Sequence, residues 1–280
     1  MTTNRTTLLT WLITGASSGI GRALAAAAAE RGDRVVALAR TLEPLRRLAD
    51  EHDPHVLPLA VDVRRPEEVD AAVQRGLREF GRLDVVANNA GYGLFGAVEE
   101  ASDEQARAVF DTNLFGALNV LRATLPVLRA QRSGHVLQGS SCYGQSAHPG
   151  VGLLAATKHA LEGLSDALAE EVAPLGIRVT LVEPGLTATP FLSNLDVAEA
   201  IADYDPTVRH VQQEIGRLPA SAFDSAEDVA AAVLEAVDAD RPPRRLATGR
   251  AGASAMRAAL TARLDELDAW APVGEVVDAA

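Results

Sequence analysis

The chain has 280 residues, and its 26 Lys and Arg against 38 Asp and Glu give a formal net charge of −12. This length suits one large α/β domain better than two small ones. The acidic balance lacks the basic footprint of a nucleic-acid-binding protein, so no nucleic-acid partner is expected. Hydrophobic residues make up 48% and aromatic residues only 4%, so the core must be built from Ala, Val and Leu. Such a core is typical of parallel strands covered by helices.

The sequence also bears on the compartment. A single cysteine, Cys142, excludes an intramolecular disulfide framework and fits a reducing cytosol. The first ten residues have no long apolar core, and no stretch of about 18 apolar residues occurs, so neither a signal peptide nor a membrane-spanning helix is expected. No histidine, cysteine or carboxylate set has a metal-ligand spacing, so no metal site is expected. The predicted location is cytoplasmic, without a membrane partner.

Short apolar segments alternate with longer helical segments over the first 185 residues, with no linker and no internal repeat. This alternation predicts one domain over residues 1–280 with a parallel sheet. Pro66 and Ser225 lie where helices commonly begin. The predicted strands are 8–14, 34–39, 56–63, 83–87, 135–139, 177–182 and 244–248, and the predicted helices are 20–31, 66–80, 103–131, 152–172 and 225–237.

Two segments depart from this alternation. Residues 187–221 form a long insertion after the sixth strand, which is typical of a lid or binding element and otherwise of a surface excursion. Its Phe191, Leu192 and Leu195 favour a medium-sized, partly apolar substrate. Residues 251–280 form a C-terminal extension with a predicted helix over 253–267. The extension could pack on the domain, join a neighbouring subunit or be disordered.

A glycine-rich turn follows the first predicted strand. Residues 14–21 read Thr-Gly-Ala-Ser-Ser-Gly-Ile-Gly and open an alanine-rich helix. At such a turn, backbone N–H groups and the positive end of the helix can bind a pyrophosphate. Gly15, Gly19 and Gly21 are needed because a Cβ would block the phosphate or force a disfavoured φ. The turn therefore predicts a dinucleotide site.

Residues 14–21 resemble the cofactor loop of the short-chain dehydrogenase/reductase family, and further motifs follow in that family's order over residues 8–190. They are Asn88-Asn89-Ala90-Gly91, Asn113, Ser140-Ser141, Lys158, and Pro184-Gly185 with Thr189. The resemblance implies a Rossmann-type doubly wound parallel sheet of order 3-2-1-4-5-6-7, with helices on both faces and a helical lid. It implies a site at the carboxyl ends of the strands. It also implies a homodimer or homotetramer formed through residues 103–131 and 152–172.

The resemblance assigns cofactor roles by position. Asp62 and Val63 flank the adenine, Asn89 contacts the adenosine ribose, and Thr189 and the backbone near Leu186 bind the carboxamide. The full set is Gly15, Ser17, Ser18, Gly19, Ile20, Gly21, Arg40, Asp62, Val63, Asn89, Ala90, Gly91, Lys158, Pro184, Gly185, Leu186 and Thr189.

The end of the second predicted strand indicates which cofactor is bound. An acidic residue there would bind the 2′-hydroxyl of NAD, but this chain has Ala39 followed by Arg40. A guanidinium suits a 2′-phosphate. The expected cofactor is therefore NADP(H), although a solvated surface arginine is the alternative interpretation of Arg40.

Similar enzymes use four catalytic side chains, and one is missing here. The resemblance places Asn113 in a water-mediated proton relay, Ser141 on the substrate carbonyl, and Lys158 on the nicotinamide ribose. The fourth is a tyrosine four residues before the lysine, on the same helix face. That position holds Leu154, which has no proton to give, and its neighbours Leu153 and Ala155 are equally inert.

Three explanations of Leu154 stay open. Tyr143, two residues beyond Ser141, is a candidate substitute acid, or else an ordinary loop aromatic. The protein could instead bind NADP(H) and perform non-redox chemistry or act as a sensor. The leucine could also be an introduced substitution, although phenylalanine would be the usual choice for removing a hydroxyl. His148, His159 and Cys142 are expected to be packing, surface or pocket-lining residues, since no activating partner is visible.

The leading hypothesis is an NADP(H)-dependent oxidoreductase acting on a ketone or secondary alcohol. It retains Asn113, Ser141 and Lys158, and Tyr143 is its candidate acid. The alternative is a redox-inactive or non-redox protein on the same scaffold, such as an isomerase, lyase, cyclase or cofactor sensor. The expected partners are a small-molecule substrate and further copies of the chain.

Overall fold

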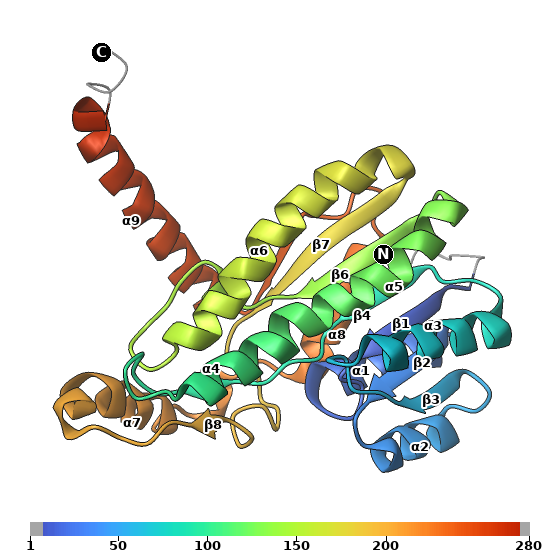
Figure 1. Cartoon of the computed structure of the whole chain (residues 1–280), viewed down its shortest axis with the longest axis horizontal. Helices are drawn as coiled ribbons and strands as arrows, with labels where there is room; N and C mark the ends of the chain where they lie inside the picture. The colour runs from blue at the N-terminus through green and yellow to red at the C-terminus, as the bar shows by residue number, and fades with distance from the viewer. Residues whose placement is uncertain (1–7, 275–280) are drawn as a thin grey trace.

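The computed structural model describes residues 8–274. Its central feature is a seven-stranded parallel sheet in the order β3-β2-β1-β4-β6-β7-β9 (Figure 1). Counted among these strands alone, the order is 3-2-1-4-5-6-7, as predicted. The strands are β1 (Thr10–Thr14), β2 (Arg34–Ala39), β3 (Val56–Ala60), β4 (Val85–Asn88), β6 (Gly134–Gly139), β7 (Ile177–Pro184) and β9 (Arg245–Thr248).

Helices cover both faces of the sheet, because the strands are apolar on both sides. Along β1, Trp11 and Ile13 face one core while Leu12 faces the other. The first core is closed by α1 (Gly19–Glu30), α2 (Leu42–Glu51) and α8 (Ala226–Asp238). The second core is closed by α3 (Pro66–Phe80), α5 (Gly116–Gln131) and α6 (Gly152–Val172). This arrangement is the α/β doubly wound sheet that the sequence predicts.

The differences from the predicted elements are local. Helix α2 was not predicted, and the third strand ends at Ala60 rather than at residue 63. The predicted helix 103–131 is divided into α4 (Asp103–Phe110), a π-helical segment (Asp111–Phe115) and α5. A π segment inserts one residue into the helical repeat and often marks a functional site. Helices α3 and α8 begin as expected, with Pro66 in the first turn and Ser225 accepting a hydrogen bond from Asp228 N.

The segment after β7 lies over the carboxyl ends of the strands, on the side of the molecule where Figure 1 shows α7 and β8. It contains β8 (Asp196–Val197), which pairs with β5 (Leu94–Phe95), and α7 (His210–Gly216). Glu100 holds this lid: its carboxylate accepts hydrogen bonds from Ala97 N at 2.7 Å and Ile201 N at 2.8 Å and pairs with Arg209.

The C-terminal helix is longer than predicted. Helix α9 runs from Arg250 to Gly274, against a predicted 253–267, and it projects away from the body (Figure 1). Residues 275–280 of the predicted extension lie outside the described residues. Within residues 8–274, no helix is both long and apolar enough to cross a membrane.

Candidate active site

A cleft of about 790 Å³ opens at the carboxyl ends of the strands. It is bounded by the turns after β1, β2, β3, β4, β6 and β7, by α6 and by the lid. Among its lining residues are these predicted positions: Gly15, Ser17, Ser18, Gly19, Ile20, Arg40, Asp62, Val63, Asn89, Ala90, Gly91, Ser141, Tyr143, Lys158, Pro184, Gly185, Leu186 and Thr189. The fold thus brings together residues that are 174 positions apart, from Gly15 to Thr189.

The glycine-rich turn has the geometry of an anion site. Gly15 and Gly19 adopt φ values of +67° and +52°, which L side chains rarely adopt. Helix α1 begins directly after them, and its N-cap, Ser18, makes no side-chain capping bond. The first-turn N–H groups therefore point toward the cleft without a side-chain acceptor. Gly21 has a different role, because a Cβ on it would lie 2.4 Å from Gly15 O: it permits close packing and does not line the cleft.

Two arginines stand at one end of the cleft. Arg40 is exposed there, directly after β2. Arg64, which was not among the predicted site residues, also lines the cleft and donates to the Asp62 carboxylate from Nη2 at 2.5 Å. The hydrogen bonds from Arg64 lower the pKa of Asp62 and outweigh the effect of burial. Arg64 could have been predicted from the sequence, because it is a basic residue directly after the third predicted strand, as Arg40 is after the second.

Lys158 is on α6, and its ammonium donates to Gly139 O at 2.6 Å. A Cβ on Gly91 would lie 3.8 Å from Lys158 Nζ, so the turn after β4 passes directly beside it. Burial lowers the pKa of Lys158 from 10.5 to about 8. The ammonium therefore remains mostly protonated at neutral pH, with further N–H donors available for a ligand hydroxyl.

Asn113 lies in the π-helical segment and is almost fully buried. Its Oδ1 accepts from Tyr92 N at 3.0 Å, while its Nδ2 donates to Tyr92 O at 3.0 Å and to Thr157 Oγ1 at 3.2 Å. The neighbouring Thr112, rather than Asn113, lines the cleft. In this structure the amide side chain therefore fixes the turn after β4 against α6, next to Lys158.

Ser141 and Cys142 follow β6. The Ser141 hydroxyl accepts a hydrogen bond from Tyr143 N at 3.2 Å, and its nearest acceptor, Pro184 O, is 3.5 Å away. The serine proton is thus held only loosely and is available to a substrate oxygen. Burial raises the pKa of the Cys142 thiol, so this cleft-lining residue stays protonated and is a poor nucleophile.

Leu154 lies one helical turn before Lys158 and is 3% exposed. It lines the cleft and belongs to an apolar cluster under the lid. The members of this cluster are Phe95, Ala97, Val151, Leu154 and Val208, with Tyr143, Leu195 and Tyr204 packed against them. Leu154 therefore contributes a non-polar surface at the place where the family pattern has a phenol.

Tyr143 packs against that cluster and forms a pair with His148. The phenol oxygen is 2.7 Å from His148 Nε2, and the two rings meet edge to face. His148 Nδ1 lies 2.9 Å from Pro149 O, which can only accept, so Nδ1 carries the proton of a neutral ring. His148 Nε2 therefore accepts a hydrogen bond from the Tyr143 hydroxyl. Burial raises the pKa of Tyr143, so the phenol stays protonated.

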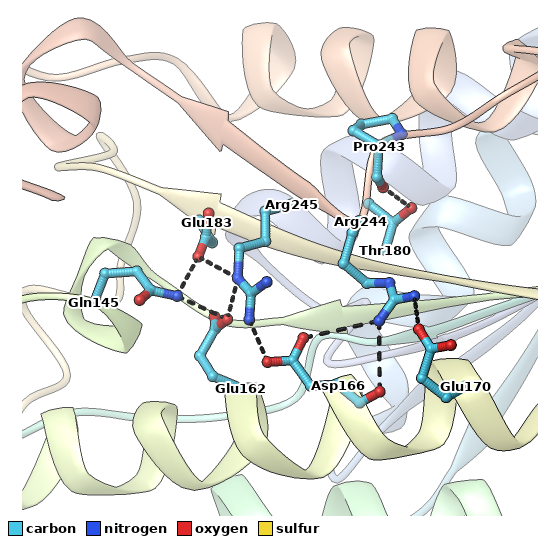
Figure 2. Close-up of polar contacts among 9 residues, drawn as sticks. All are labelled: Gln145, Glu162, Asp166, Glu170, Thr180, Glu183, Pro243, Arg244 and Arg245. Carbon is cyan, nitrogen blue, oxygen red and sulfur yellow. Dashed lines mark hydrogen bonds and ion pairs between the residues drawn. The ribbon is translucent and has the colours of Figure 1, made fainter. Parts of the chain in front are cut away.

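An ionic cluster around two buried carboxylates, Glu162 and Glu183, also contains Gln145 and Arg245 (Figure 2). The Ser140 hydroxyl donates to Glu162 Oε1 at 2.5 Å, and Gln145 Nε2 donates to Glu162 at 2.9 Å and to Glu183 at 3.1 Å. Arg245 Nε lies 2.8 Å from Glu162 and 3.7 Å from Glu183. Burial, then the Glu162 charge, raises the pKa of Glu183.

This cluster ties the serine loop to α6, β7 and β9, and so fixes Ser141 relative to Lys158. The cluster was not predicted from the sequence. The one feature of the sequence that indicates it is an acidic residue, Glu183, within the otherwise apolar end of β7.

These residues fit a nicotinamide dinucleotide. The glycine-rich turn leaves a helix N-terminus free for the pyrophosphate, and Lys158 offers N–H donors deeper in the cleft. Pro184, Gly185 and Thr189 form the wall where the carboxamide would lie. Chemically, the site can polarise a carbonyl oxygen through Ser141, but its Leu154 cannot protonate that oxygen.

Known proteins resemble the chain along most of its length. The family model for short chain dehydrogenase matches residues 10–200. The oxidoreductase BOA17 of Botryotinia fuckeliana is 39% identical over 241 residues, covering 85% of this chain and 88% of that protein. A short-chain dehydrogenase from Streptomyces avermitilis has a solved structure with a TM-score of 0.90 and 36% identity, covering 97% of this chain and 99% of that one.

A third relative has been solved with a bound cofactor. It is a short-chain dehydrogenase/reductase from Burkholderia phymatum, solved in complex with NAD, with 26% identity and a TM-score of 0.79 over 89% of this chain and 92% of that one. Together with the parallel sheet, the glycine-rich cleft and the positions of Ser141 and Lys158, these matches show that the chain belongs to the short-chain dehydrogenase family.

Proposed function

We propose that the protein is an NADP(H)-dependent oxidoreductase that interconverts a ketone and a secondary alcohol on a medium-sized, partly apolar substrate. The observation that carries this proposal is the presence of Ser141 and Lys158 on the wall of one cleft with the glycine-rich turn. A protein that only bound the cofactor would not need a loosely held serine hydroxyl beside the carboxamide wall. Phe191, Leu192 and Leu195 of the lid supply the apolar side of the substrate site.

The choice of NADP(H) rests on charge. Arg40 stands at the end of β2, where a carboxylate would be required to hold the 2′-hydroxyl of NAD. Arg64 lies at the same end of the cleft, but Asp62 already engages its guanidinium. Arg40 is therefore the principal candidate ligand for a 2′-phosphate, which an arginine fork binds well.

The proton route is the second part of the proposal. When bound, the reduced cofactor supplies a hydride to the carbonyl carbon. Ser141 donates a hydrogen bond to the carbonyl oxygen, and Tyr143 gives that oxygen its phenolic proton. Tyr143 then recovers a proton from water, by way of the partly exposed His148 ring that its hydroxyl contacts. In the oxidation direction, each proton moves the opposite way.

The buried Leu154 favours one rival. Because the family's usual acid position is apolar, the same cleft could serve non-redox chemistry, as in an isomerase, lyase or cyclase, or could bind NADP(H) as a sensor. The rival predicts tight NADPH binding without its oxidation. Oxidation of NADPH during turnover therefore distinguishes the two proposals.

The experiment compares cofactor binding with turnover. NADPH affinity is measured by fluorescence, and a panel of ketones is then screened for alcohol formation and NADPH oxidation together. One alcohol formed per NADPH consumed supports the oxidoreductase. Tight binding without any oxidation, or conversion of substrate that leaves NADPH intact, would establish the rival instead.

The Arg40→Ala variant tests the cofactor choice in the same assay. Its NADPH affinity should fall at least about tenfold, equivalent to about 1.4 kcal/mol, while NADH affinity stays the same. If the unmodified protein binds NADH as tightly as NADPH, the choice of NADP(H) is wrong.

A further inference from the structure

Helix α9 contacts the body through residues of its first half. A Cβ on Gly252 would lie 2.7 Å from Gly185 Cα, and Met256 is only 4% exposed. Arg263 Nη2 lies 3.0 Å from His159 Nε2 on α6. From Leu260 to Val273 every residue is exposed, and Figure 1 shows this half of the helix standing clear of the molecule.

The free half of α9 carries an apolar stripe. Leu260, Leu264 and Leu267 are 43%, 60% and 66% exposed. Their spacing of four and then three residues places them on one helix face, and Met256 lies on that same face one turn earlier. The surface that packs α9 onto the body therefore continues outward as a row of leucines, with Trp270 beside it at 65% exposure.

The charges on α9 are divided between its two halves. The half before Leu264 carries only basic residues, Arg250, Arg257 and Arg263, and the half after it carries only acidic ones, Asp265, Glu266 and Asp268. This polarity opposes the helix dipole, which favours acidic residues near the N-terminus and basic ones near the C-terminus. The charges therefore gain nothing from the helix dipole, but they make the two halves of α9 complementary to a second copy that runs in the opposite direction.

We propose that α9 pairs antiparallel with α9 of a second copy of the chain, about a two-fold axis near Leu264. An antiparallel arrangement sets the basic half of each helix against the acidic half of the other. The two leucine rows then face each other, with Leu260 opposite Leu267 of the other copy and the two Leu264 side chains meeting at the axis. A two-fold interface requires a self-complementary surface, and the leucine row and the divided charge of α9 supply one.

The pairing is tested by disulfide trapping in the full chain with Cys142→Ala as background. Leu264→Cys should give a disulfide-linked dimer under mild oxidation. Val273→Cys should give none, because in an antiparallel pair its two copies lie about 27 Å apart along the axis, far beyond disulfide reach. Ala262→Cys, on the opposite helix face, is the matched control and should also stay monomeric on a non-reducing gel.

Each other result overturns the proposal. Linkage at both Leu264→Cys and Val273→Cys would indicate a parallel pair, and linkage at neither would indicate that α9 does not meet a second copy. A second measurement covers the chance that cysteine perturbs packing. Leu264→Glu should halve the mass in sedimentation equilibrium while circular dichroism stays unchanged, and an unchanged mass would also contradict the pairing.

Discussion

At the scale of single residues, Leu154 decides how the site can handle a proton. Its side chain faces the cleft one turn from Lys158, packed within the apolar cluster under the lid. We predict that Leu154→Tyr raises ketone reduction, because a phenol at this position would lie on the same helix face as the lysine ammonium. A positioned general acid is worth about 10²–10⁴-fold in rate.

The control is Leu154→Phe, which adds the ring without the hydroxyl. It should show no comparable gain, so the difference in kcat between the two variants isolates the proton. Equal rates for the two variants would mean that the missing phenol is not what limits the reaction.

Tyr143 provides a complementary prediction. If Tyr143 is the acid, Tyr143→Phe should lower kcat by roughly 10²-fold or more with KM little changed, because the proton is needed only in the transition state. His148→Gln keeps a hydrogen-bonding side chain beside the phenol but cannot pass a proton to it, so it should lower kcat less than Tyr143→Phe does. Unchanged kcat in Tyr143→Phe would remove Tyr143 from the mechanism.

At the scale of elements, the lid depends on Glu100. Burial alone would raise the pKa of Glu100, but the N–H donors of Ile201 and Ala97 and the Arg209 guanidinium lower it below its ordinary value of 4.5. Because the folded-state pKa of Glu100 is depressed, the stabilisation that its carboxylate gives the lid is fully present above pH 4.5. It is lost as the pH falls through the lower, folded-state pKa. The lid should therefore loosen only in acid.

We predict that Glu100→Gln loosens the lid at neutral pH, because Arg209 loses its charged partner while the shape is kept. Limited proteolysis by trypsin at Arg209 and Arg217 should become several-fold faster. Glu104→Gln, an exposed change on the adjoining α4, is the matched control and should leave the cleavage rate unaltered. Equal cleavage rates in both variants would show that Glu100 does not hold the lid.

The sequence predicts elements well where periodicity is strong, as in the seven strands and the helices that bury Val and Leu. It does not reveal α2, a short helix between two strands whose only buried residues are Leu45 and Leu48. Nor does it reveal the π segment at Asn113, because that distortion is set by packing between α5 and its neighbours. The site residues on turns were predictable by position, but the cluster of Glu162, Glu183 and Arg245 was not, since it joins residues from three elements.

At the scale of the whole molecule, His135 couples stability to pH. It lies on β6 with 1% exposure, and its Nε2 bonds Thr180 Oγ1 at 2.9 Å, while its Nδ1 has no hydrogen-bond partner within residues 8–274. Burial, reinforced by the Arg178 charge, lowers the pKa of His135 from 6.5 to about 3. In that window the unfolded chain binds a proton that the folded chain does not.

Stability should therefore fall as the pH drops from 6.5 toward 3, by an amount on the order of 4 kcal/mol for this group. His135→Gln keeps a donor for Thr180 without titrating, so its urea-unfolding free energy should vary less between about pH 4 and pH 7. The exposed His210→Gln is the control and should keep the original pH dependence. The same slope in both variants would contradict the assignment.

The contact between Gly252 and Gly185 joins two events that are usually considered separately. Gly252 lies in the first turn of the helix that we propose to be shared between subunits, and Gly185 belongs to the wall expected to receive the nicotinamide end of the cofactor. With no side chain between the two backbones, movement of one is passed directly to the other. Subunit association and cofactor affinity would then be thermodynamically linked. If association raises cofactor affinity by a given factor, cofactor binding must strengthen association by the same factor. On that basis the enzyme would lose affinity for its cofactor on dilution, and a saturating cofactor would hold the subunits together.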